Sequence, residues 1–170
     1  NDPSTTEIYT LSLHNALPIS PAGTEYPLLE IFTEAMGRIN FAHQMIDRKG
    51  ITDRVTLNGM TLMNWEIFGF PMSDGYVETL AASDENLTKP GVFFRGTFNL
   101  GEPADTFIDM TNFMKGFVWV NGHNLGRYWE IGPQTRLFCP APWLKKGANE
   151  IIIFDLHKTT PGPVRGFESM

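Results

Sequence analysis

The chain has 170 residues, of which 42% are hydrophobic, and its formal net charge at pH 7 is −6. This apolar fraction supports a buried core, while the acidic balance without a Lys/Arg-rich run argues against nucleic acid and membrane as partners. Twelve prolines and sixteen glycines favour many short strands and turns over long helices, and no apolar stretch approaches the ~20 residues of a membrane-spanning helix.

The first twenty residues differ in character from the rest of the chain. Within residues 1–20, the segment TEIYTLSLHNALPIS resembles the translation of a sequencing-adaptor oligonucleotide. We therefore expect residues 1–20 to be a non-native leader without an evolved function, and they enter no fold prediction. Because the chain does not begin with Met, we expect it to be a fragment of a longer gene product.

Residues 21–70 carry short strand-like runs separated by turn residues. Their last segment, residues 65–70, is aromatic-rich and has the length of a strand. Upstream of it, Asn58-Gly59 lies between apolar runs and predicts a hairpin, because a type I′ turn requires positive φ at both central residues. Residues 71–90 mix Ser, Asp, Glu, Gly and Pro, which is typical of a linker or long surface loop.

Residues 91–160 are rich in strand and turn signals and are predicted to form a second β module. A second hairpin is expected at Asn121-Gly122, and residues 161–170 follow the last predicted strand as a tail. Strands bounded by turn formers are predicted over residues 106–109, 117–120 and 151–154. Since no helical stripe is evident, the sequence predicts an all-β fold, an antiparallel β-sandwich or jelly roll.

Residues with catalytic potential are scattered along the chain. Glycoside hydrolysis needs two facing carboxylates, but the acids show no pattern that marks a pair, and Glu66 and Asp109 on predicted strands are expected to be exposed or in local ion pairs. The histidines show no metal-ligand spacing, and Cys139 is expected to be buried, with a reactive thiol as the alternative. The sequence thus predicts no catalytic residue, no metal site and no cofactor.

The segment GFVWVNGHNLGRYW, residues 116–129, concentrates aromatic, amide and basic side chains. Sugars pack their C–H faces on aromatic rings and bond their hydroxyls to planar polar groups, so this cluster is a candidate for carbohydrate binding. Strand alternation equally places Trp119 in a sandwich core, and the other aromatics equally suit docking against a neighbouring domain. Both interpretations apply to the following residues: Trp119, Asn121, His123, Asn124, Arg127, Tyr128 and Trp129.

Several longer motifs carry a family resemblance. They are MGRINFAHQMIDRKGIT, VTLNGMTLMNWEIF, FFRGTFNL, PADTFIDM and KGFVWVNGHNLGRYWEIGPQTRLFCPAPWLKKGANEIIIFDL. Over residues 27–168 the chain resembles the C-terminal β region of the β-galactosidases of glycoside hydrolase family 35. The resemblance implies two galactose-binding-like jelly rolls that pack against an N-terminal (β/α)8 barrel, and this barrel carries both catalytic glutamates. It also implies that residues 21–70 are the C-terminal part of a first β domain, that residues 91–160 are a near-complete second domain, and that the tail at residues 161–170 is truncated.

The same resemblance sets the functional expectations. The parent enzyme would be secreted or periplasmic and would release terminal β-galactose with retention, whereas this piece would be inactive alone, with the barrel and galactosides as its partners. Relatives often have Tyr at the position of Phe41, and in some of them the β domain helps to shape the active-site mouth. Phe41 is therefore a candidate for that mouth in the full enzyme, although it lacks the hydroxyl that a hydrogen bond from this position would need. Two alternatives stay open: an autonomous carbohydrate-binding module that uses residues 119–129, and a purely structural module.

Overall fold

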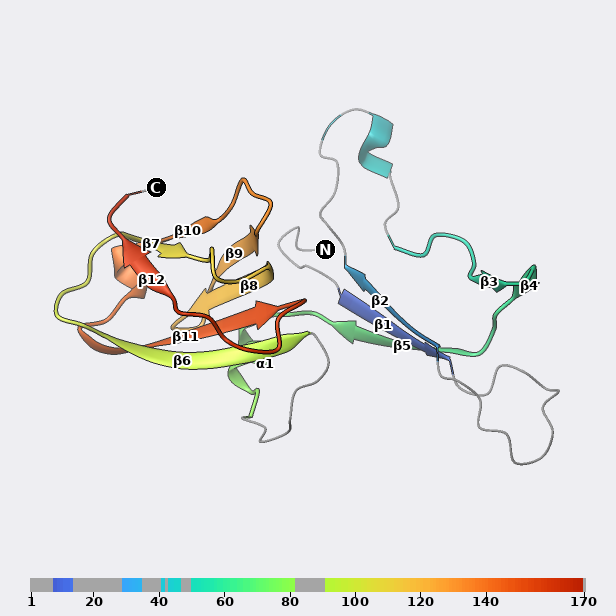
Figure 1. Cartoon of the computed structure of the whole chain (residues 1–170), viewed down its shortest axis with the longest axis horizontal. Coiled ribbons are helices and arrows are strands. Elements are labelled where there is room, and N and C mark those ends of the chain that lie inside the picture. The colour runs from blue at the N-terminus through green and yellow to red at the C-terminus, as the bar shows by residue number, and fades with distance from the viewer. Residues whose placement is uncertain are drawn as a thin grey trace. The chain divides into compact units, whose positions relative to one another are not determined.

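The computed structural model describes residues 8–13, 29–34, 41, 43–46, 50–81 and 91–169. The chain divides after Ser73 into two compact units, and both are built mainly of antiparallel strands (Figure 1). The all-β class predicted from the short strands and turn residues is confirmed.

The first unit is a three-stranded antiparallel sheet with a small hairpin beside it. In the sheet, β1 (Ile8–Leu13) lies between β2 (Leu29–Glu34) and β5 (Trp65–Phe70). The hairpin and a 3-10 turn complete the described part of this unit: β3 (Thr56–Leu57), β4 (Met60–Thr61) and η1 (His43–Ile46). The strand predicted over residues 65–70 is confirmed, with the same bounds.

The leader segment contributes to this sheet. Residues 8–13 form its central strand and pair along their whole length with both neighbours. The rest of the leader, residues 1–7 and 14–20, lies outside the described residues. Although the leader entered no fold prediction, the structure thus includes part of it; its origin stays a prediction.

The second unit is a two-layer sandwich. One layer is a four-stranded sheet in the order β6-β11-β8-β9, and the other is a three-stranded sheet in the order β10-β7-β12 (Figure 1). The first sheet comprises β6 (Val92–Leu100), β8 (Lys115–Val120), β9 (His123–Trp129) and β11 (Gly147–Asp155). The remaining elements are α1 (Asp74–Glu78), β7 (Thr106–Asp109), β10 (Arg136–Cys139), η2 (Ala141–Trp143) and β12 (Arg165–Phe167).

The core of the second unit lies between its two sheets. Val118 and Val120 of β8 belong to one buried cluster with Ile108 of β7 and with Leu137 and Cys139 of β10. Burying such a cluster on folding contributes about 1.5–3 kcal/mol for each large aliphatic side chain. The buried position predicted for Cys139 is confirmed, since its side chain is 0% exposed.

The four-stranded sheet is also buried on its other face. Phe117 and Trp119 alternate with the core valines along β8, so they point away from the sandwich core. Both side chains are nevertheless buried, as are Ile152 and Phe154 on the neighbouring strand β11. We call this second apolar layer, together with Phe93 of β6, the outer face.

Two regions differ in detail from the expected organisation. The segment 71–90 was expected to be a linker or loop, and it contains α1, while residues 82–90 lie outside the described part. The tail 161–170 contains β12, which pairs antiparallel with β7. Neither element shows a strong sequence pattern, because each is short and is held by contacts to distant strands.

Candidate functional site

The candidate cluster occupies the β8–β9 hairpin, whose turn is Asn121-Gly122. These two residues have φ of 48° and 82°, as a type I′ turn requires, and Asn58-Gly59 has nearly the same pair, 49° and 82°. Both hairpins predicted from the sequence are therefore confirmed.

Trp119 and Tyr128 lie inside the second unit, each 1% exposed. The Tyr128 hydroxyl lies 2.9 Å from the Phe154 carbonyl oxygen and 2.9 Å from Oδ2 of Asp155, and both oxygens can accept its proton. Burial and the neighbouring Asp155 raise the pKa of Tyr128 above its ordinary value. A side chain at Gly116 would overlap the Phe154 carbonyl, so glycine is required for this close approach.

Asp155 is the centre of this buried polar group, and its side chain is 0% exposed. One carboxylate oxygen accepts a bond of 2.8 Å from the Met114 amide as well as the Tyr128 hydroxyl. The other accepts bonds of 2.8 and 2.9 Å from the amides of His157 and Lys158. Sequence reasoning did not single out Asp155. The available signal was a carboxylate at the end of the apolar strand IIIF, immediately before a turn.

Asn121 also directs its side chain into the fold. Its Nδ2 donates to the carbonyl of Trp143 at 2.7 Å and to Oδ1 of Asn149 at 2.8 Å, while its Oδ1 accepts from the Glu150 amide at 3.0 Å. Asn149 is 2% exposed and closes the loop that follows η2 by bonding to Lys145. Asn121 therefore positions the loop before β11, and its amide is engaged within the domain.

The remaining candidates lie nearer the surface. His123 is exposed and stacks on Trp143, with ring centroids 4.7 Å apart and an interplanar angle of 18°. Asn124 is exposed as well, and its Oδ1 accepts a bond of 2.7 Å from the Gly126 amide.

Two further candidates, Arg127 and Trp129, are half-buried. The Arg127 guanidinium lies 5.3 Å from the Phe117 ring centroid, and the Lys115 ammonium lies 4.2 Å from that of Trp129. The cluster is thus divided between a buried part and a surface part.

Phe41, Glu66 and Asp109 lie in different settings. Phe41 is 80% exposed in the first unit, and Glu66 on β5 is exposed. Asp109 is buried, accepts a bond of 3.0 Å from the Thr111 hydroxyl, and lies 3.8 Å from Nε of Arg136. The ion pair expected for Asp109 is therefore present. Among the described residues, no group of three His, Cys, Asp or Glu side chains is placed to hold a metal ion.

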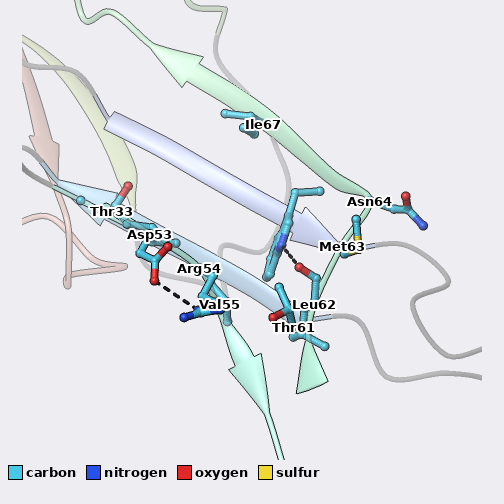
Figure 2. Close-up of a pocket in the computed structure, with 12 residues that line it drawn as sticks. Thr33, Asp53, Arg54, Val55, Thr61, Leu62, Met63, Asn64 and Ile67 are labelled. Carbon is cyan, nitrogen blue, oxygen red and sulfur yellow. Dashed lines mark hydrogen bonds and ion pairs between the residues drawn. The ribbon is translucent and has the colours of Figure 1, made fainter. Parts of the chain in front are cut away.

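The first unit contains an open hollow of about 600 Å³ (Figure 2). Trp65 lies in it, and its indole Nε1 donates to the Leu62 carbonyl at 3.0 Å. Asp53 and Arg54 form an ion pair of 3.2 Å among the lining residues. Apolar and polar side chains both line the hollow, and an exposed ion pair of this kind contributes little to binding or stability.

Two family models match the chain, one in each unit. The first all-β domain of β-galactosidase matches residues 5–72, and the galactose-binding domain of β-galactosidase matches residues 91–149. The chain therefore contains β-galactosidase β domains. It belongs to the C-terminal β region of the β-galactosidases of glycoside hydrolase family 35.

Curated relatives agree with these matches. β-Galactosidase-1-like protein 3 of Rattus norvegicus is 40% identical over 75% of this chain and 21% of its own length. β-Galactosidase-1-like protein 2 of Homo sapiens is 37% identical over 84% of this chain and 23% of its own. The β-galactosidase of Xanthomonas manihotis is 41% identical over 69% of this chain and 19% of its own. The chain spans about a fifth of the length of these relatives.

The relatives are larger than this chain, which makes other domains of the same polypeptide plausible partners. Within the described residues, no helix has both the length and the apolar character needed to cross a membrane.

Proposed function

We propose that the chain is a non-catalytic β-domain piece of a β-galactosidase and scaffolds a (β/α)8 catalytic domain of the same polypeptide. The whole enzyme would hydrolyse terminal non-reducing β-D-galactose residues through a retaining mechanism, in which two carboxylates about 5–5.5 Å apart flank the scissile bond. The observation that carries this proposal is the pair of adjacent matches, each to a β domain of β-galactosidase.

The use of the buried carboxylates supports a non-catalytic role. Of the described residues, the buried acids are Asp109 and Asp155. Asp109 bonds to Thr111 and lies near Arg136, whereas Asp155 bonds to backbone amides and Tyr128. Each carboxylate is thus engaged in holding the fold, and a catalytic acid must instead face the substrate.

The exposed apolar side chains of the first unit support a docking role. Phe32 of β2 is 47% exposed, and Ile67 and Phe68 of β5 are 65% and 50% exposed on alternate faces of the strand. Exposed apolar side chains concentrated on one sheet are typical of a protein–protein contact. We therefore expect the isolated chain to self-associate in sedimentation velocity, and a strictly monomeric chain at tens of micromolar would contradict docking through this sheet.

Turnover of a chromogenic β-galactoside tests the catalytic part of the proposal. The purified chain should release no chromophore above the buffer blank, while an intact family 35 β-galactosidase assayed beside it should. Activity that co-purifies with the chain through two different columns would contradict the proposal.

The second candidate function is autonomous carbohydrate binding by the 119–129 cluster. The stacked His123–Trp143 pair at the hairpin surface and the half-buried Trp129 favour it, because each offers aromatic surface to a sugar. The test is titration with galactose and lactose while the tryptophan indole signals are followed by NMR. A saturable shift of the Trp129 or Trp143 signal would support binding, and unchanged signals at millimolar sugar would exclude it.

A further inference from the structure

We propose that residues 74–80 form a strap over the outer face of the four-stranded sheet, and that this strap opens while the sandwich stays folded. The strap consists of α1 and the two residues that follow it, and it is hydrogen-bonded to Arg95 of β6. It precedes residue 91, where the match to the galactose-binding domain begins.

The outer face is an aromatic layer. Phe93 lies with its ring centroid 6.4 Å from that of Trp119 and 4.6 Å from that of Phe154, and Phe117 lies 6.2 Å from Trp119. These rings point away from the sandwich core, and Phe117, Trp119 and Phe154 are at most 4% exposed. A cover over this face is therefore required to keep it from water.

Arg95 of β6 fastens the strap to the sheet. Its Nη1 donates to the Leu80 carbonyl at 3.2 Å and its Nη2 to the Glu78 carbonyl at 3.4 Å, while its Nε lies 3.3 Å from Oε1 of Glu150 on β11. One guanidinium thus joins two carbonyls of the strap to a carboxylate of the sheet. The strap also lies close to the β8–β9 turn, because a Cβ on Gly122 would lie only 2.5 Å from Oε1 of Glu78.

These attachments are weak compared with the sheet beneath. A five-residue helix is not stable by itself, and Val77 is its buried residue. The Arg95 side chain is 42% exposed, so water competes for its hydrogen bonds. Segments with few buried apolar contacts open at a lower free energy than core strands do. We therefore expect the strap to unfold locally while the sheet stays intact.

The Trp119 indole proton reports directly whether the strap covers the outer face. Its indole Nε1 is buried and has no hydrogen-bond partner among the described residues. The indole proton is therefore protected from exchange by coverage alone, whereas the Leu80 amide is bonded to the Val77 carbonyl at 3.3 Å within the strap. If the strap opens as a unit, both protons become accessible in the same event.

Hydrogen exchange of the full chain, followed by NMR, tests the strap. In the unmodified chain the Trp119 indole and Leu80 amide should have protection factors at least about 100-fold below that of the Ile152 amide on β11. The Arg95→Met variant should lower the first two by a further factor of about ten and leave Ile152 unchanged. Arg54→Met, which removes an exposed arginine of the first unit, should change none of the three.

Three results would overturn the strap. In the unmodified chain, a Trp119 indole protection factor equal to that of the Ile152 amide would show that the outer face opens only with the whole sheet. In Arg95→Met, unchanged Trp119 exchange, or equal acceleration of Trp119 and Ile152, would show that Arg95 is no separate fastening. The measurement on the unmodified chain decides the matter even if the variant fails to fold.

Discussion

At the residue scale, Asn121 and Tyr128 show how sugar-binding residue types can serve a fold. Asn121 bonds to the loop before β11, and the Tyr128 hydroxyl lies within bonding distance of Asp155 and of a β11 carbonyl. Because buried polar groups are costly when unpaired, these bonds fix one arrangement of the hairpin and its neighbours. Loss of one partner should therefore cost more than loss of an exposed polar group.

Asn121→Gly separates the two roles of this residue. Glycine keeps the positive φ of the turn but removes three side-chain hydrogen bonds and leaves Asn149 without one partner. We expect the free energy of unfolding of the second unit to fall by about 1–3 kcal/mol in chemical denaturation. The matched control is Asn58→Gly in the other hairpin, where φ is 49° and the side chain is exposed, and we expect a change below about 0.5 kcal/mol in the first unit. Equal losses in the two hairpins would contradict the role given to the Asn121 side chain.

Cys139 predicts a loss of stability in alkali. Burial, with a smaller contribution from Asp105, raises the pKa of its thiol to about 11 from an ordinary value of 9.0. The folded state thus favours the protonated thiol, and this stabilisation is complete below pH 9 and is lost as the pH rises toward 11. The loss should reach about 2 kcal/mol for a shift of this size.

The measurement is the free energy of unfolding between pH 8 and pH 11 for the unmodified chain and Cys139→Ala. The alanine variant lacks the thiol, so its stability should fall less steeply across this range, whatever its stability at pH 8. Parallel curves would contradict the contribution assigned to Cys139.

At the element scale, strands with a clear local sequence pattern were predicted, whereas two short elements were not. The strands predicted over residues 65–70, 106–109, 117–120 and 151–154 are present, because alternation and turn residues define them locally. In contrast, α1 has one buried side chain and β12 spans three residues, so neither produces a readable period. Contacts from distant residues hold both elements, and such contacts leave no local pattern.

β12 pairs with β7 through the backbone, and Arg136 of β10 adds side-chain contacts to β12 and to the residue that follows it by two. Its guanidinium lies 4.3 Å from the Phe167 ring centroid, and its Nη1 donates to the Ser169 carbonyl at 3.3 Å. We expect Arg136→Met to accelerate exchange of the Phe167 amide about fivefold while the Ile152 amide is unaffected, as measured by NMR. Arg165→Met, which changes an exposed arginine on β12 itself, is the control and should have little effect. Equal acceleration of Phe167 amide exchange in both variants would show that the positive charge on this sheet, rather than the specific contacts of Arg136, holds β12.

At the scale of the whole molecule, the two units differ in how well they cover their apolar side chains. The second unit buries both faces of its larger sheet, whereas exposed large apolar residues are concentrated in the first. This difference fits a first unit whose sheet needs further protein for cover and a second unit with a core of its own.

The sequence indicated the fold class and the family, but it indicated the candidate site only by residue type. Residue type alone could not predict that Trp119 is buried and His123 is exposed. Both lie on one hairpin, and strand alternation does not say which face of the hairpin is covered. Here both faces of β8 are covered, which a two-layer pattern does not predict. The roles of the surface candidates stay predictions until ligand titrations are made.

The central proposal is that this chain is a non-catalytic piece without a glycosidase nucleophile, and covalent trapping tests it most directly. A retaining β-galactosidase forms a galactosyl-enzyme intermediate, which a 2-deoxy-2-fluoro-galactoside with a good leaving group accumulates. The measurement is the intact mass of the chain after incubation with this reagent, with a complete family 35 β-galactosidase as the positive control. We predict that the control gains the mass of one fluorosugar and that this chain keeps its own mass. A gain of one fluorosugar on this chain, at a single carboxylate, would contradict the account.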